Sequence, residues 1–283
     1  LGPALVGADP RRIGLVHDVM AATMDGGQGA RSAVDIACWD LLGKVYGERV
    51  CDLLGGARMD PVLTYHVVPI GTPEASAQLA GELQDEGHNK LQLKSGGRHI
   101  DEDIDAIHAV ARVIRPGVDL FVDCNRGWTV SQAIQVSSAC RDLKLAIEQP
   151  CASYAECATA RAHLHHPLIL DESATDLATI ARAIATGVAD GFGMKLTRIG
   201  GISGMRAVRD LCEAFKTPTS CDDSWGGDII AAACVHVGAT LQPHLSRGAW
   251  ISDPYQTGHY DEAHGPRIVN GMIAVPPGPG LGI

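Results

Sequence analysis

Aromatic side chains are scarce in this sequence, at 4% of its 283 residues, and positive charge is in deficit. The apolar fraction of 46% is nevertheless ordinary for a globular protein. The net charge of −10 argues against nucleic acid or an anionic membrane surface as a partner. No apolar run approaches the roughly 18 residues that a membrane-spanning helix needs, so we also expect no membrane partner.

Paired cysteine motifs are missing too. The nine cysteines are scattered, no CxxC occurs, and Cys151 and Cys157 are too isolated to indicate zinc. Small, buried, unpaired cysteines are typical of a reducing compartment. No signal peptide is visible, and we therefore expect a cytoplasmic protein.

From about residue 61 the chain repeats a short apolar strand, a polar turn and an amphipathic helix. Eight strands alternating with seven helices predict an α/β fold with a closed parallel (TIM) barrel. An open doubly wound sheet is the alternative, disfavoured because no glycine-rich phosphate loop follows the first strand. The expected strands are PVLTYHVV (61–68), KLQLK (90–94), DLFVDCN (119–125), LAIEQP (145–150), LILDES (168–173), GFGMKL (191–196), PTSCDD (218–223) and LQPHLS (241–246).

The two ends of the chain depart from this repeat. The first contains helical stretches at about 11–24 and 31–46, and the last contains a lone strand over 267–273 before a tail rich in proline and glycine. We expect these ends to pack together outside the barrel. The predicted organisation is a helical remainder of a capping domain (1–57), a catalytic barrel (58–265) and a C-terminal segment returning to the cap (266–283).

Charged residues close six successive predicted strands. Their spacings are 29, 25, 23, 24 and 27 residues, about one strand–helix unit each. In a closed barrel such strand ends form one ring, on the face where barrel enzymes hold their active sites. Strand alternation agrees, because Phe121 shares a face with Asp123, and Ile169 with Asp171. The six residues are Lys94, Asp123, Glu148, Asp171, Lys195 and Asp222.

Asp123, Glu148 and Asp171 end three adjacent strands. Converging carboxylates repel one another unless a cation holds them. Oxygen ligands without His or Cys suit a hard divalent ion, Mg²⁺ or Mn²⁺. The alternative, in which each acid caps a helix or pairs with a surface lysine, would have to hold for three acids in phase. We therefore predict a divalent-metal site.

Lys94 precedes these acids by one unit and Lys195 follows them by one, so a ring would set the two amines on opposite sides of the metal. The metal would stabilise the enediolate formed when an α-proton leaves a carboxylate substrate. One lysine removes that proton and the other returns a proton to the opposite face. This pattern predicts a two-base racemase or epimerase. The alternatives are two structural salt bridges, or a Schiff base on Lys195 that leaves the acids and Lys94 without a role.

Several motifs together resemble the enolase superfamily, in its mandelate racemase and muconate lactonising enzyme branch. ARSAVDIACWDLLGKVYGERVCDLLGG resembles the end of the family's capping domain, and PPGPGLGI its C-terminal return to the cap. VDCNRGW, IEQP, LDES and GMKLTRIGG resemble its third to sixth strand motifs. The resemblance implies a modified (β/α)7β barrel under an α+β cap whose N-terminal sheet is missing here, and a homo-oligomer, commonly an octamer. It also implies Mg²⁺ at Asp123, Glu148 and Asp171, with general acid/base residues Lys94 and Lys195.

LQLKSGG, DGFGMKLTRIGG and SCDDSWGGDIIAAACVHVGAT are similar to the group of proline betaine racemases and 4-hydroxyproline betaine 2-epimerases. This resemblance implies a small-molecule substrate that carries a carboxylate and a quaternary ammonium. Aromatic faces and carboxylates bind such a cation. We expect Trp250 rather than Trp225 to supply the aromatic face, and Asp222, with Asp223 beside it, to supply the acid.

Two positions depart from the family's pattern. Gln92 stands where many relatives have the first lysine of Lys-x-Lys, and we expect it to touch the substrate carboxylate or to orient Lys94. The first strand, TYHVVPIG, differs from the betaine group, so Tyr65 or His66 could alter the ring that is accepted; an ordinary hydrogen-bonded histidine is the preferred interpretation of His66.

Three other functions compete with betaine inversion. A cis-3-hydroxy-L-proline dehydratase would use the same metal and lysines, and would lose hydroxide from the neighbouring carbon. A dipeptide epimerase is a second alternative that no feature favours. The third, from a different class, is a barrel that binds a betaine without turnover, which has no need of paired lysines.

Overall fold

The computed structural model describes all 283 residues and separates into two compact units. The first unit comprises Leu1–Leu63, Met194–Ile268 and Ile273–Ile283, and the second comprises Thr64–Gly193 and Val269–Met272. None of the helices combines the length and the apolar character required to cross a membrane.

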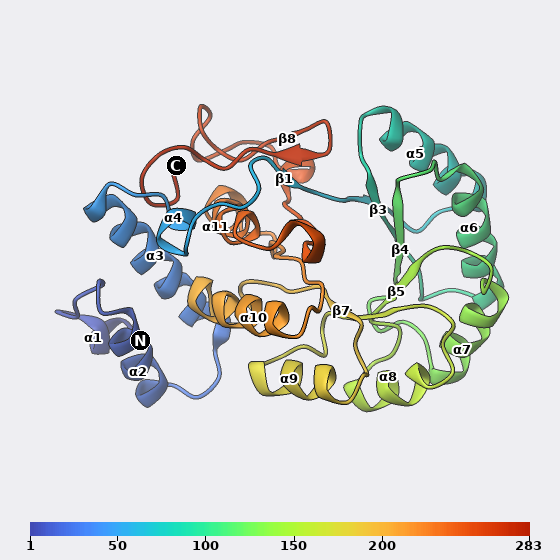
Figure 1. Cartoon of the computed structure of the whole chain (residues 1–283), viewed down its shortest axis with the longest axis horizontal. Helices are drawn as coiled ribbons and strands as arrows, with labels where there is room; N and C mark the ends of the chain where they lie inside the picture. The colour runs from blue at the N-terminus through green and yellow to red at the C-terminus, as the bar shows by residue number, and fades with distance from the viewer. The chain divides into compact units, whose positions relative to one another are not determined.

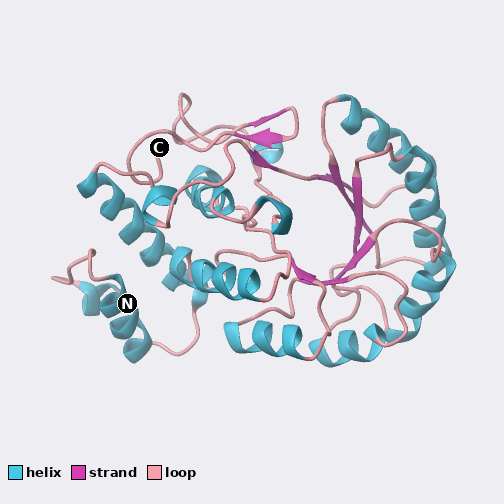
Figure 2. Ribbon diagram, in the orientation of Figure 1, coloured by secondary structure: helices cyan, strands magenta, loops and turns pink.

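A six-stranded parallel sheet forms the centre of the second unit (Figures 1 and 2). Its strands follow one another in chain order, and every neighbouring pair is parallel. A doubly wound sheet reverses its strand order partway, so this order argues against that alternative and is consistent with a modified TIM barrel. The strands are β2 (His66–Val68), β3 (Lys90–Lys94), β4 (Asp119–Asp123), β5 (Ala146–Glu148), β6 (Leu168–Leu170) and β7 (Gly191–Phe192).

Five helices of the second unit follow the outer side of this sheet (Figure 1). They cover apolar strand residues such as Leu91 and Leu93, which are fully buried. Gln92 and Lys94 alternate with them and point to the opposite face. Local chemistry fixes the helix starts; α8, for instance, begins with a capping box between Ser153 and Glu156. The helices are α5 (Pro73–Asp85), α6 (Ile100–Val113), α7 (Val130–Ala139), α8 (Tyr154–Arg161) and α9 (Leu177–Ala185).

The first unit is mainly helical. The two helices predicted near its start are confirmed as α2 (Ile13–Thr23) and α3 (Gln28–Tyr46), and α10 (Ile202–Ala214) packs against α3. A second, three-stranded sheet consists of β1 (Val62–Leu63), β9 (Met272–Ile273) and β8 (Ile268–Val269) in that order, and the division into units cuts through β8 and β9. The remaining elements are α1 (Gly2–Leu5), α4 (Val50–Leu53), α11 (Gly227–Ala239) and the 3-10 helices η1 (Pro243–Leu245) and η2 (Asp253–Tyr255).

A buried histidine ties three segments of the first unit together. His236 on α11 accepts a hydrogen bond from the Cys51 N–H at 3.3 Å and donates one to the Leu281 carbonyl at 3.0 Å. Burial lowers the pKa of His236 to about 4, so the ring is neutral at pH 7. The C-terminal segment is therefore anchored to α4 and α11.

Four strand predictions need correction. The stretch 61–68 divides into β1 and β2, which belong to different sheets. The stretch 218–223 carries only isolated bridges. Half of 241–246, Pro243–Leu245, is the 3-10 helix η1, and Pro243 has no N–H to donate to a ladder. The lone strand over 267–273 is a hairpin that turns at Asn270 and Gly271, both with positive φ, a pairing typical of a type I′ turn.

Candidate functional site

The carboxyl ends of β3, β4 and β5 bring three predicted site residues into one row. Lys94 lies opposite Asp123 in the β3–β4 register, and Asp123 lies opposite Glu148 in the β4–β5 register. Asp171 follows β6 directly, whose Ile169 pairs with Glu148. The sequence spacing therefore located the strand ends correctly. We call Asp123, Glu148 and Asp171 the carboxylate row.

The carboxylate row is buried, with residue exposures of 1%, 2% and 3% in chain order. The Lys94 ammonium donates to Asp123 Oδ2 at 2.5 Å, and the Asn125 N–H donates to Asp123 Oδ1 at 2.9 Å. The Gln92 amide donates to Glu148 Oε2 at 3.3 Å. Gln92 thus contacts a predicted metal ligand, a role that its position two residues before Lys94 did not reveal.

Gly193 leaves space in the second unit for the side chains of Glu148 and Asp171. A Cβ atom built on Gly193, just after β7, would lie 2.5 Å from Glu148 Oε1 and 3.5 Å from the Asp171 Cβ. Both acids therefore approach the same point on the backbone. Only a residue without a side chain leaves room for the Glu148 carboxylate there.

The donor set of the carboxylate row fits a hard divalent cation, since it consists of buried carboxylate oxygens from three neighbouring strands. No three His, Cys, Asp or Glu side chains converge as a ready-made metal cluster in this structure. One oxygen of Asp123 is engaged by Lys94, and one of Glu148 by Gln92. A cation would therefore have to compete with an ammonium and an amide for these oxygens.

Replacing Gly193 by alanine tests the crowding at the row. The new methyl group would displace the Glu148 carboxylate, so we expect Mg²⁺ affinity to fall about tenfold, as is usual when support around metal ligands is lost. Isothermal titration with MgCl₂ measures this. Gly81→Ala is the control, because its Cβ meets nothing within 4 Å on helix α5. Equal Mg²⁺ affinity in the Gly193→Ala variant and the wild type would show that Glu148 is not a ligand.

Asn125 and Glu172 join this cluster although the sequence did not point to them. Asn125 accepts from Lys94 Nζ at 3.1 Å and donates its amide to Glu172 Oε1 at 3.2 Å. Burial, and then the charge of Asp171, raises the pKa of Glu172. In the sequence, only their positions could have indicated this role, because Asn125 and Glu172 each stand within two residues of an acid at a strand end.

The first unit holds the other predicted residues around Lys195. Lys195 and Asp222 form an isolated parallel bridge, and Lys195 Nζ lies 3.6 Å from Asp222 Oδ2. Asp222 is fully buried and accepts from the Ser220 hydroxyl at 2.6 Å and from the Trp250 N–H at 3.1 Å. Asp222 thus fixes the surroundings of Lys195.

Asp223 joins two loops of the first unit. One of its oxygens accepts from the Gly226 N–H at 2.9 Å, next to the start of α11, and the other from the Ser252 hydroxyl at 2.9 Å. Both oxygens are therefore engaged by the protein, and the side chain is buried at 1% exposure.

Three aromatic side chains gather in the same unit. Trp225 packs edge-on against Trp250 at 5.1 Å between ring centroids and lies 5.3 Å from Tyr255. Trp250 is 6% exposed, whereas Trp225 is 67% and Tyr255 48% exposed. Trp225 also adopts a positive φ of 66°, which few residues other than glycine do. The open aromatic faces thus belong to Trp225 and Tyr255 rather than to Trp250, on which the sequence analysis relied.

The residues of the first strand take different places. Tyr65 is 4% exposed and meets Phe121 edge-on at 5.0 Å, on the strand face that Phe121 shares with Asp123. The His66 ring lies 5.0 Å from the His88 ring. Tyr65 is therefore the residue of this pair that packs beneath the carboxylate row.

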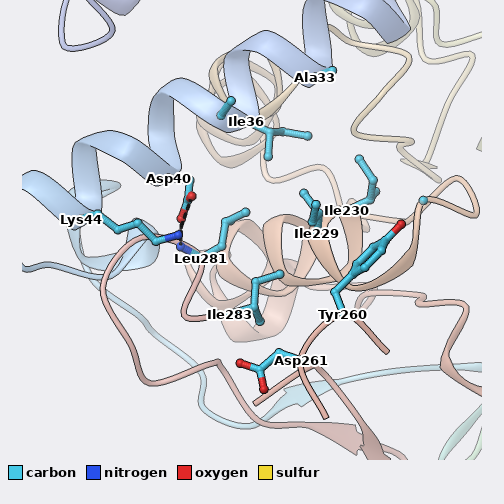
Figure 3. A pocket seen from close by; sticks show the side chains of 12 residues that line it. Ala33, Ile36, Asp40, Lys44, Ile229, Ile230, Tyr260, Asp261, Leu281 and Ile283 are labelled. Atoms are coloured by element: carbon cyan, nitrogen blue, oxygen red, sulfur yellow. Dashed lines mark hydrogen bonds and ion pairs between the residues drawn. The ribbon is translucent and has the colours of Figure 1, made fainter. Parts of the chain in front are cut away.

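A hollow of about 530 Å³ lies within the first unit, and none of the predicted site residues lines it (Figure 3). Apolar side chains of α3 and α11 line it, including Ile36 and Ile229, and the Asp40–Lys44 ion pair stands at its edge. Nothing in the sequence pattern indicated this hollow.

Comparison with known proteins identifies related chains over the whole length. Residues 75–283 match the family "Enolase C-terminal domain-like", and residues 1–55 match "Mandelate racemase / muconate lactonizing enzyme, N-terminal domain". A cis-3-hydroxy-L-proline dehydratase of Roseibium aggregatum is 38% identical, over 100% of this chain and 77% of its own length. An N-succinyl-L-Arg/Lys racemase of Bacillus cereus is 32% identical over 71% of this chain and 56% of its own.

Solved structures agree. A putative mandelate racemase/muconate lactonizing enzyme of Roseovarius nubinhibens ISM, complexed with magnesium, superposes with a TM-score of 0.95 and 32% identity. The alignment covers 99% of this chain and 78% of that one.

Proposed function

The chain belongs to the mandelate racemase and muconate lactonizing enzyme family of the enolase superfamily, and from that premise we propose that it dehydrates a cis-3-hydroxy-L-proline-type substrate with a divalent metal. The sequence motifs alone favoured betaine inversion over dehydration. The dehydratase that is 38% identical over the whole chain supports the second of these better.

One contact carries the proposed chemistry. Lys94 Nζ lies 2.5 Å from Asp123 Oδ2, which puts an amine in direct contact with the carboxylate row. We assign Mg²⁺ to Asp123, Glu148 and Asp171, where it would stabilise negative charge developing on the substrate carboxylate. We infer that the amine, held beside the metal, acts on the carbon next to that carboxylate.

The lysines then divide the proton transfers. Lys94, after releasing its ammonium proton to solvent, takes the α-proton as the free amine, and the electron pair of that C–H bond forms a double bond to the neighbouring carbon. The C–O bond on that carbon breaks, and the Lys195 ammonium supplies the proton with which the hydroxyl leaves as water. Asp222 keeps the Lys195 ammonium close to a buried negative charge before this step.

Inversion of a proline betaine is the second candidate, and the exposed faces of Trp225 and Tyr255 favour it. A quaternary ammonium cannot donate hydrogen bonds, so an aromatic surface binds it better than polar groups do. In this reaction the second lysine would protonate the α-carbon from the opposite face instead of protonating a hydroxyl.

Proton NMR in D₂O separates the candidates. With MgCl₂ and cis-3-hydroxy-L-proline, we expect the α-proton signal to disappear while a dehydrated product accumulates. L-proline betaine, tested in parallel, should keep its α-proton and its optical rotation. Exchange and loss of rotation with the betaine alone would establish inversion instead. No reaction with either compound, in protein that binds Mg²⁺, would overturn both and support a non-catalytic binder.

A further inference from the structure

Gln149 stands between two of the proposed metal ligands and is fully buried. It follows Glu148 directly and precedes Pro150, with a positive φ of 35°. We propose that Gln149 is a positioning residue, which fixes the backbone of Asp171 relative to Glu148 and thereby sets the metal affinity of the carboxylate row. This inference rests on the metal site assigned above.

The amide oxygen of Gln149 binds the backbone that follows β6. It accepts hydrogen bonds from the Asp171 N–H at 3.1 Å and from the Ser173 N–H at 3.0 Å. Both donors belong to the loop that leaves β6, where the chain has no ladder partner for them. A side chain from β5 therefore holds the backbone from which the Asp171 carboxylate projects.

The amide nitrogen of Gln149 fixes the direction of that oxygen. It donates to the Ser173 hydroxyl at 2.7 Å and to the Cys151 carbonyl at 3.0 Å. Ser173 thus contacts both ends of the amide, so a flipped amide would lose bonds at each end. The side chain is held in one orientation by the groups it organises.

The backbone of Gln149 is also hydrogen-bonded to both neighbouring strand ends. Its N–H donates to the Ile169 carbonyl on β6 at 2.9 Å, and its carbonyl accepts from the Arg126 N–H, after β4, at 2.9 Å. Gln149 therefore links the ends of the strands that carry Asp123, Glu148 and Asp171. A left-handed conformation just before a proline is restricted, and these bonds hold the residue in it.

The consequence for the metal follows from geometry. A divalent ion needs all three carboxylates at once, and Asp171 has a short side chain whose reach depends on its backbone. Without the Gln149 amide, the buried Asp171 N–H and the half-buried Ser173 N–H lose their acceptor, and the loop after β6 must shift to find others. Partners behind metal ligands commonly contribute 10–100-fold to metal affinity.

Gln149→Leu tests the proposal, because it keeps the size of the side chain and removes its hydrogen bonds. We expect the Kd for Mg²⁺, measured by isothermal titration with MgCl₂, to rise 10–100-fold. Gln84→Leu is the matched control. Gln84 is also buried and also bridges backbone groups, donating to the Ala80 carbonyl at 2.7 Å and accepting from the Arg115 N–H at 2.9 Å. Its Kd should stay within twofold of the wild type, although urea denaturation should show stability losses in both variants.

The outcomes are distinct. A folded Gln149→Leu protein that binds Mg²⁺ as tightly as the wild type would overturn the positioning role while leaving the metal site intact. A wild type that does not bind Mg²⁺ would overturn the metal site itself. If Gln149→Leu does not fold, Gln149→Asn replaces it; its amide is one methylene too short to hold Asp171 and Ser173 together, so its Kd should rise several-fold, and an unchanged Kd would refute the proposal.

Discussion

Glu148→Gln should be at least as stable as the wild type without Mg²⁺ and less stable than the wild type with Mg²⁺. Without the ion, Glu148 shares a buried row with two other acids, so removing its charge relieves repulsion and the variant unfolds at equal or higher urea concentration. The Gln92 amide can still donate to the carbonyl oxygen of the new side chain. With the ion at about 100 times its Kd, the wild type gains about 2.7 kcal/mol, which the variant largely forgoes.

Urea denaturation with and without MgCl₂ measures this crossing. Glu82→Gln is the control, because exposed Glu82 also accepts from a glutamine amide, that of Gln78 at 2.9 Å, but lies on helix α5. It should respond to Mg²⁺ as the wild type does. The same Mg²⁺-dependent stabilisation in Glu148→Gln would rule out Glu148 as a ligand. Activity of the variant should fall at least 100-fold.

The strand ends could be predicted because two simple periods coincide there. A strand–helix unit of about 25 residues repeats, and alternation within each strand assigns one face to the charged residue. Lys94, Asp123 and Glu148 consequently fall in register as their spacing requires. The parallel sheet follows from the same pattern, and four of the motifs that resemble the family, VDCNRGW, IEQP, LDES and GMKLTRIGG, lie at these strand ends.

The partners of these residues could not be predicted, because loops bring them together. Asp103 reads in sequence as a surface acid in the first turn of α6, yet it is fully buried. It accepts from the Gly96 N–H at 2.9 Å and from the Trp128 ring at 2.7 Å. It thus joins the loop after Lys94 to the loop after Asp123. The strand–helix repeat relates one strand end to the next and does not indicate a bond between a helix residue and a loop residue.

Aromatic exposure was equally hidden from the sequence. Trp225 and Trp250 each follow a predicted strand, and position alone favoured the second. In the structure Trp250 is buried and its backbone N–H donates to the Asp222 carboxylate, whereas Trp225, which has a positive φ, is exposed. A non-glycine residue in this conformation leaves no mark in a pattern of polar and apolar residues.

Lys94→Met should separate catalysis from metal binding. The replacement keeps the length of the side chain and removes the amine, so we expect α-proton exchange with cis-3-hydroxy-L-proline in D₂O to fall 10²–10⁴-fold, the usual contribution of a general base. Mg²⁺ affinity should rise rather than fall, because the ammonium that now occupies Asp123 Oδ2 at 2.5 Å no longer competes with the ion. Proton NMR measures the exchange, and isothermal titration with MgCl₂ measures the affinity.

Lys44→Met is the matched control for the expected loss of α-proton exchange and the expected gain in Mg²⁺ affinity. Lys44 also pairs with a carboxylate, Asp40, at 2.8 Å, but lies on α3 in the first unit, and its removal should alter neither quantity. A purely structural Lys94 would weaken Mg²⁺ binding together with activity, since Asp123 would lose the partner that orients it. Full exchange activity in Lys94→Met would show that another group is the base, and loss of exchange in Lys195→Met in the same assay would identify that base as Lys195.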